Sequence, residues 1–333
     1  MNDKAGLKEL IRRTYETLKA GEADAAQNLL RQALEIDYEH PEVLYALKCL
    51  NWWLGKLERM DDFHSPCERG EYILSLWKPY YAFLERMGDF PHGASILSEP
   101  ADSCQYAIKR FAYCRALDCF KEHVGTGSQD PALLLQMGRC CKGAGEWDDA
   151  ARYLEMASSL KRDDSAILSE LADVKALLGE ERTAKVLFRE AFFLEPQEIN
   201  LHGLESEMML QLLGAVKKMG YAGAELAEWI PVWGCILGAF SLKRELKPVE
   251  LGRLKQSILA LESEHRNPPP RPELALPPRG KGGGAPFTKP RLLNRYFWLI
   301  DHCEHNRDTS GLIDETMLKI KVIDSVVYEQ YRS

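Results

Sequence analysis

The chain has 333 residues and a formal net charge of -7. This acidic balance excludes a general nucleic-acid binder, because neutralising phosphates requires a basic face on the protein. Hydrophobic residues make up 45% and charged residues 28% of the chain. That composition is typical of a folded protein and excludes a chain that is disordered throughout.

The start of the chain and its cysteines predict a cytoplasmic protein. The first ten residues include acidic side chains and lack the apolar run that a secretory signal needs. The most apolar stretch, 229–242, is interrupted by Pro231 and is shorter than the roughly 20 residues needed to cross a bilayer. The nine cysteines, an odd number scattered mostly through helical patterns, are expected to be reduced thiols. We therefore expect no transmembrane segment.

Two glycines in the middle of the chain start the same series of residues. Gly145 is followed at five, nine and twelve residues by Ala150, Leu154 and Ala157. The same spacings follow Gly179, 34 residues later, and also follow Gly21. A period near 34 residues indicates helical hairpins, in which glycine ends the first helix and small residues let the two helices approach closely. The residues expected to make this packing are Gly21, Ala26, Ala33, Gly138, Gly145, Ala150, Ala157, Gly179, Ala184, Phe188, Ala191 and Pro196.

This pattern resembles the tetratricopeptide-repeat family, most closely over residues 131–196. Met137-Gly138 matches the family's Leu-Gly pair, and Trp147 matches its second aromatic position. Leu134 stands in place of the family's tryptophan, and Cys141 stands in place of its tyrosine. The resemblance implies an all-helical solenoid, a right-handed superhelix of stacked hairpins, that binds other proteins.

Four regions are expected along the chain. Residues 1–196 form the repeat region, which is irregular between 41 and 130 and broken near 61–66 and 89–100. Residues 197–266 continue as helices. Residues 267–290, rich in proline and glycine, form a basic linker. Residues 291–333 return to helical spacing and form a terminal hairpin, which is too small to be stable alone and is expected to dock on the body as a cap.

The resemblance also implies a binding surface. In this family a ligand lies along the concave face formed by the first helix of each pair. Tyr15 projects there in the first copy, as do its neighbours Lys8 and Ile11. The other positions expected to contact a protein or peptide partner are Tyr45, Trp52, Leu135, Arg139 and Lys142. Aromatic residues and arginine are typical anchors, although Tyr45 and Trp52 fit equally well as packing against the neighbouring hairpin.

No catalytic constellation stands out, and neither a cofactor nor a metal is expected. His302 and His305 share a helix face, but no second cluster at ligand spacing accompanies them. Two alternatives remain open. One is an enzymatic or regulatory domain within residues 200–333. The other is contact of the basic linker with RNA or an acidic membrane, since residues 266–295 carry seven basic side chains and one acidic one.

Overall fold

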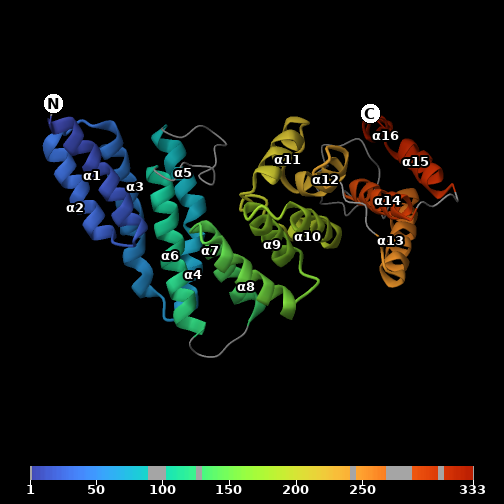
Figure 1. The fold of residues 1–333 in the computed structure, drawn as a ribbon, viewed down its shortest axis with the longest axis horizontal. Helices are drawn as coiled ribbons and strands as arrows, with labels where there is room; N and C mark the ends of the chain where they lie inside the picture. The colour runs from blue at the N-terminus through green and yellow to red at the C-terminus, as the bar shows by residue number, and fades with distance from the viewer. Residues whose placement is uncertain are drawn as a thin grey trace. The chain divides into compact units, whose positions relative to one another are not determined.

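The structure is a computed structural model that describes residues 2–88, 103–124, 130–240, 245–267, 287–306 and 311–332. Those residues form helices and connecting turns, with no strand among them, so the predicted all-helical fold is confirmed. The helices pack largely in adjacent pairs (Figure 1). Most of the predicted linker and the predicted break at 89–100 lie outside the described residues.

The chain divides into two compact units, Met1–Lys161 and Arg162–Ser333, which we call unit 1 and unit 2. This division falls inside the predicted repeat region, so each unit contains part of the repeats. Unit 1 contains α1 (Asn2–Lys19), α2 (Ala23–Ile36), α3 (Pro41–Leu57), η1 (Glu58–Asp62), α4 (Pro66–Ser75), α5 (Trp77–Met87), α6 (Cys104–Val124), α7 (Pro131–Gly143) and α8 (Trp147–Leu160). Unit 2 contains α9 (Ser165–Leu177), α10 (Glu181–Leu194), η3 (Pro196–Glu198), α11 (Glu207–Lys218), α12 (Gly223–Ile236), α13 (Pro248–Arg266), α14 (Thr288–His305), α15 (Leu312–Ile323) and α16 (Ser325–Arg332).

The hairpins α1–α2, α7–α8 and α9–α10 are closed by the same turn. Each contains a glycine in the left-handed region, with φ of 90° at Gly21, 80° at Gly145 and 81° at Gly179. In the second hairpin the N–H of Gly145 donates to the carbonyl of Lys142, and the N–H of Glu146 donates to the carbonyl of Cys141, both at 2.9 Å. The other two turns repeat this pair of bonds. It is the Schellman arrangement, in which glycine adopts the left-handed conformation without steric penalty.

Small side chains lie where the two helices of each hairpin meet. Gly138 of α7 packs so closely on α8 that a Cβ atom there would lie 2.5 Å from Cγ of Leu154. The alanines of the repeated series are fully buried in all three hairpins: Ala26, Ala33, Ala150, Ala157, Ala184 and Ala191. Larger side chains at these positions would force the two backbones apart.

Unit 1 is organised around α6, which contacts α1, α3, α4 and α7. Its buried residues lie on more than one side of the helix, which is typical of a helix enclosed by others. They include Ala107, Ile108, Phe111, Ala116 and Phe120, each no more than 2% exposed. The helix α6 therefore connects the hairpin α1–α2 to the hairpin α7–α8.

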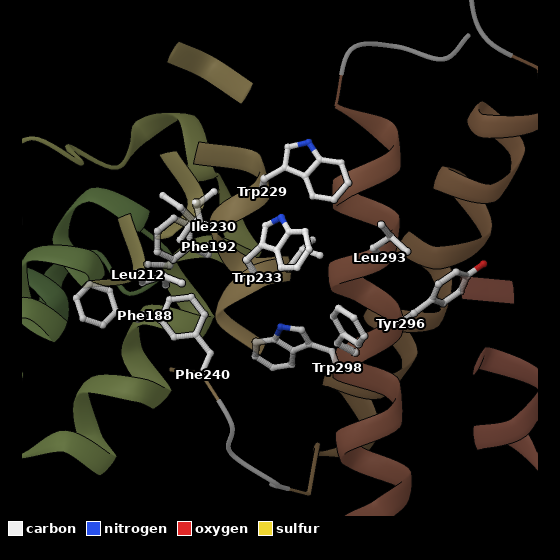
Figure 2. Packing of buried hydrophobic residues seen from close by; sticks show 14 of the residues in the cluster. Phe188, Phe192, Leu212, Trp229, Ile230, Trp233, Phe240, Leu293, Tyr296 and Trp298 are labelled. Carbon is white, nitrogen blue, oxygen red and sulfur yellow. The ribbon is translucent and has the colours of Figure 1, made fainter. Parts of the chain in front are cut away.

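Unit 2 has its core around α14. This helix contacts α12, α13 and α15, and most of its side chains are buried. Figure 2 shows Trp229 and Trp233 of α12 facing Trp298 and Leu293 of α14, with Phe188 and Phe192 of α10 on the far side of α12. The C-terminal part of the chain therefore supplies a central layer of this unit, whereas the sequence predicts a cap.

A buried ion pair fixes the start of α14. The guanidinium of Arg291 donates to Glu228 of α12 through Nη2 at 2.6 Å and Nε at 2.9 Å, and its Nη2 also bonds Glu195 at 2.6 Å. Gln197 donates to the same Glu228 carboxylate at 2.9 Å. The Glu228 side chain is fully buried, so its charge depends on these donors.

The structure differs in one detail from the predicted terminal hairpin. The second helix of that hairpin is divided into α15 and α16. Asp324 lies at the division with extended backbone angles. Its Oδ1 accepts the N–H groups of Val326 at 2.9 Å and Val327 at 3.0 Å. A short acidic side chain in this conformation starts a new helix and so ends the preceding one. No helix in the described parts of the chain has both the length and the apolar character that crossing a membrane requires.

The close packing of Gly138 predicts a loss of stability when a methyl group is added. Gly138→Ala should lower the free energy of unfolding by about 1–3 kcal/mol, because Leu154 has to move. The matched control is Gly55→Ala in α3, where an added Cβ meets nothing within 4 Å. That change should stabilise the protein by roughly 0.5–1 kcal/mol through helix propensity. Urea titration measures both, and equal effects would contradict the packing described.

The ion pair at Glu228 predicts a non-additive double variant. Arg291→Met should lower the free energy of unfolding by about 3 kcal/mol, because it leaves a buried carboxylate without its cation. Adding Glu228→Gln to Arg291→Met should restore most of the loss, since the neutral amide no longer needs that partner. The control Arg59→Met removes an exposed pair with Asp62 and should change stability by less than about 1 kcal/mol. Additive effects of Arg291→Met and Glu228→Gln would argue against the coupling.

Candidate functional site

A groove of about 920 Å³ runs along α1 in unit 1. Its volume lies within the range of protein sites that hold small ligands or several side chains of a peptide. One wall is α1, and the other is the turn between α2 and α3 with the first residues of α3. The lining residues are Ala5, Leu7, Lys8, Glu9, Ile11, Arg12, Tyr15, Glu16, Lys19, Asp37, His40 and Glu42.

Local sequence explains how the two walls form. Pro41 is the first residue of α3, where a missing N–H does not weaken the helix, and His40 before it has extended backbone angles. The turn of residues 37–40 thus reverses the chain between α2 and α3. This turn and the start of α3 face α1, and Glu42 at the start of α3 reaches Tyr15 in the C-terminal half of α1.

The groove has an apolar floor and charged edges. Leu7, Ile11 and Tyr15 are 4–8% exposed, whereas Lys8 and Arg12 are exposed. The hydroxyl of Tyr15 donates to Oε1 of Glu42 at 3.0 Å and so connects the floor to the opposite wall. Burial, with the nearby Glu42 carboxylate, raises the pKa of Tyr15, so the phenol stays protonated at neutral pH and acts as a donor.

The edge of the groove along α1 carries three cations, of which Lys8 is not held by another side chain. Arg12 is paired with Glu9 at 2.6 Å and Lys19 with Glu16 at 3.2 Å. Lys8 is exposed and has no ion pair with any side chain in the described ranges, whereas Nδ1 of His40 is buried there without a hydrogen-bond partner. Across the groove from Lys8, Asp37 and Glu42 present carboxylates. An apolar floor between the unpaired Lys8 on one side and two carboxylates on the other suits a peptide segment with charged side chains of both signs.

Of the six predicted partner-binding residues, Tyr15 lines this groove. Tyr45 and Trp52, on α3, contact other parts of unit 1. The hydroxyl of Tyr45 accepts a hydrogen bond from Gln105 of α6 at 2.7 Å. The ring of Trp52 lies 5.8 Å from Phe83 and 5.0 Å from Tyr80, both of α5, between ring centroids. These two side chains are partly buried against α5 and α6, as the packing alternative describes, and a role in binding stays a prediction.

The other three predicted residues are on α7. Leu135 and Arg139 are half-buried, and Lys142 is 3% exposed. None of them lines the groove along α1. The residue that follows Lys142, Gly143, lies against the ring of Tyr113 of α6. Because Lys142 is itself almost fully buried, less of this end of α7 is accessible than the register alone suggests.

The equivalent position in the third copy has a structural role. Tyr15, Arg139 and Asp173 each stand six residues before the glycine of their turn. Asp173 is fully buried, and its carboxylate accepts the N–H groups of Glu205 at 2.8 Å and Ser206 at 2.9 Å. These N–H groups precede α11, so the aspartate fixes the start of that helix. One repeat position thus serves different purposes in the three copies.

Sequence reasoning missed His40, Glu42 and Arg12. Arg12 follows Lys8 by four residues on α1, so a helical projection could have placed it on the same face. The contribution of the α2–α3 turn could not be found this way. It depends on which end of α1 this turn approaches, and that follows from the packing of the hairpin.

The histidines and cysteines discussed above have structural surroundings. Nδ1 of His302 accepts a hydrogen bond from the N–H of Leu246 at 3.0 Å, while His305 is exposed. Within the described ranges, no three His, Cys, Asp or Glu side chains are grouped to hold a metal ion. All nine cysteines lie in these ranges and are free thiols.

No family model matches the sequence, and no curated protein matches it.

The bond between Tyr15 and Glu42 predicts a modest stability change. Tyr15→Phe should lower the free energy of unfolding by about 1 kcal/mol, because the hydrogen bond is lost while the carboxylate of Glu42 can still be hydrated. Tyr38→Phe is the matched control, since Tyr38 is 75% exposed and its change should be within about 0.5 kcal/mol. Thermal and urea unfolding of both variants test this, and a neutral Tyr15→Phe would show that the two walls are held together otherwise.

Proposed function

We propose that this chain is a protein-interaction scaffold of the tetratricopeptide-repeat kind, which binds an extended or helical segment of a partner protein in the groove along α1. We infer that its hairpins belong to a right-handed solenoid and that it acts in the cytoplasm without a cofactor. The observation that carries the proposal is the groove, with its buried apolar floor and the exposed Lys8 at its edge.

The hairpins support the structural part of this proposal. Three of them share the glycine turn, the glutamate that follows it and the buried alanines. Repetition of one hairpin is the way in which solenoids build long binding surfaces, because each unit covers the apolar face of the next.

The composition of the groove supports the functional part. Peptide recognition by helical proteins combines an apolar floor with charged groups at the edges that fix direction and register. Here Leu7, Ile11 and Tyr15 provide the floor, and Lys8 and Glu42 provide opposite charges at the two edges. A partner segment with apolar residues flanked by an acidic and a basic residue would match both edges.

Charge reversal in the groove tests the proposal. Lys8→Glu with Arg12→Glu should reduce capture of the protein's partners from cell extract at least tenfold, because two of the three positive groups that α1 contributes to the groove are inverted. Folding should be unaffected, since both side chains are exposed and the Arg12–Glu9 pair is a surface pair. The matched control is Arg31→Glu with Lys48→Glu, which makes the same charge change at exposed positions outside the groove.

A photo-crosslinker at position 8 gives an independent measurement. It should join a partner segment that a crosslinker at position 31 does not join. If both double variants capture partners equally well and position 8 yields no adduct, binding takes place elsewhere on the chain.

A further inference from the structure

The helix α13 has one narrow buried side and a wide exposed one. It packs on α14 (Figure 1), and its buried residues are Leu254 and Ile258. Ten of its 19 residues are exposed. We call these ten residues the outer face of α13: Pro248, Val249, Gly252, Arg253, Lys255, Gln256, Leu259, Ala260, Ser263 and Arg266.

All the charged residues of the outer face are positive. They are Arg253, Lys255 and Arg266, whereas the acidic residues of α13 are partly buried and lie outside this face. Arg266 is 4.0 Å from Glu262. Arg253 and Lys255 are exposed and have no ion pair with another residue in the described ranges. In a chain with a net charge of -7, this face attracts an acidic partner and repels a basic one.

Large aliphatic side chains lie on the same face. Val249 is 68% exposed and Leu259 is 64% exposed. Together with Gly252, Gln256 and Ser263 they follow one another at alternating steps of three and four residues. This spacing forms a continuous row along a helix, and a second helix can pack along such a row. We call these five residues the seam of α13.

The seam has room for the side chains of another helix at Gly252. A Cβ atom added there would have no other atom within 4 Å. The backbone of α13 is therefore accessible between Val249 and Gln256, and small residues at such places allow two helices to approach closely.

The two unpaired cations lie on opposite sides of the seam. Successive residues of a helix are about 100° apart around its axis, so Arg253 and Lys255 project about 200° apart. A helix that lies along the seam then has one of these cations on each side of it. Carboxylates on both flanks of its apolar row would pair with them.

We propose that the outer face of α13 is a second interaction surface, which binds an acidic amphipathic helix of a partner protein. The apolar row of that helix packs on Val249 and Leu259, over Gly252, and its flanking carboxylates pair with Arg253 and Lys255. This surface belongs to unit 2, whereas the groove along α1 belongs to unit 1. It therefore does not depend on binding in that groove.

The composition of the seam favours a helix over a membrane or a nucleic acid. Helices that bind a membrane surface insert bulky apolar side chains along their length. Here Gly252 and Gln256 separate the two aliphatic residues Val249 and Leu259. A nucleic acid requires cations for its phosphates, but it has no use for exposed aliphatic side chains between them.

A synthetic peptide tests the surface on the full chain. The probe is a fluorescently labelled helix of about three heptads, with leucine at both seam positions and glutamate on both flanks. Fluorescence anisotropy should show that the chain binds it, and that binding weakens as salt is added, because exposed charges are screened. A peptide with lysine in place of each glutamate should bind at least tenfold more weakly. Equal binding of the two peptides, or no binding of the acidic one, would overturn the proposal.

Substitutions on α13 locate the binding. Arg253→Glu with Lys255→Glu should weaken binding of the acidic peptide at least tenfold, because both flanking cations are inverted. Leu259→Ser should weaken it about threefold or more, since part of the apolar contact is lost. All three side chains are exposed, so circular dichroism should show that these variants remain folded. Unchanged affinity in the charge-reversed variant would refute the surface.

Two double variants of unit 1 serve as controls. Arg31→Glu with Lys48→Glu makes the same charge change at other exposed positions and should bind the acidic peptide as the wild-type chain does. Lys8→Glu with Arg12→Glu, which inverts cations of the groove along α1, should also leave the affinity unchanged. A loss of binding in that variant alone would place the peptide in the groove, which refutes the surface on α13 but leaves the proposed function standing.

Vesicles test the other class of partner. The full chain should sediment with vesicles of phosphatidylserine and phosphatidylcholine no more than its Arg253→Glu, Lys255→Glu variant does. Vesicle binding that this variant abolishes, together with no binding of the acidic peptide, would show that the face meets an anionic membrane and would overturn the proposal.

Discussion

Close approach of helix backbones is the constraint on which the described hairpins depend. It requires a side chain no larger than a methyl group at fixed places and a turn that reverses the chain at once. Glycine in the left-handed conformation supplies the turn, and the fully buried alanines supply the contact surface. Other properties of the hairpins follow from this geometry, including which residues of α1 face outward and so become available to a groove.

The backbone constraint leaves most side chains free to differ. Tyr15, Arg139 and Asp173 occupy equivalent places, yet the first lines a groove, the second is half-buried on α7 and the third holds the start of α11. Since the turn and the alanines preserve the hairpin, substitutions elsewhere change its surface without changing its shape. This freedom explains how three hairpins keep the same spacing of small residues while their other side chains differ.

The parts of the fold that could be predicted are those that depend on local sequence patterns. Helical spacing, the three glycines and the prolines that begin α3 and α7 indicate where helices lie, and the all-helical fold follows from them. The positions of α6 and α14 could not be predicted. Periodicity shows which face of a helix is apolar. Because α6 is apolar on several faces and most residues of α14 are buried, neither pattern shows which helix lies beside it. The same limit applies to the groove. The sequence predicts the helix α1, but it does not predict that the turn at His40 and Glu42 faces this helix.

The place of α14 within unit 2 affects how that unit can be made. Arg291 bonds to Glu228, which lies 63 residues earlier, and Asn294 reaches the carbonyl of Phe192, 102 residues earlier. A ribosome adds about 5–20 residues each second, so α12 exists for several seconds before α14 follows it. During that interval Trp229 and Trp233 lack the surface that later covers them, and the carboxylate of Glu228 lacks its cation. The second unit is therefore assembled late in synthesis, and its nascent form presents an apolar surface that chaperones can bind.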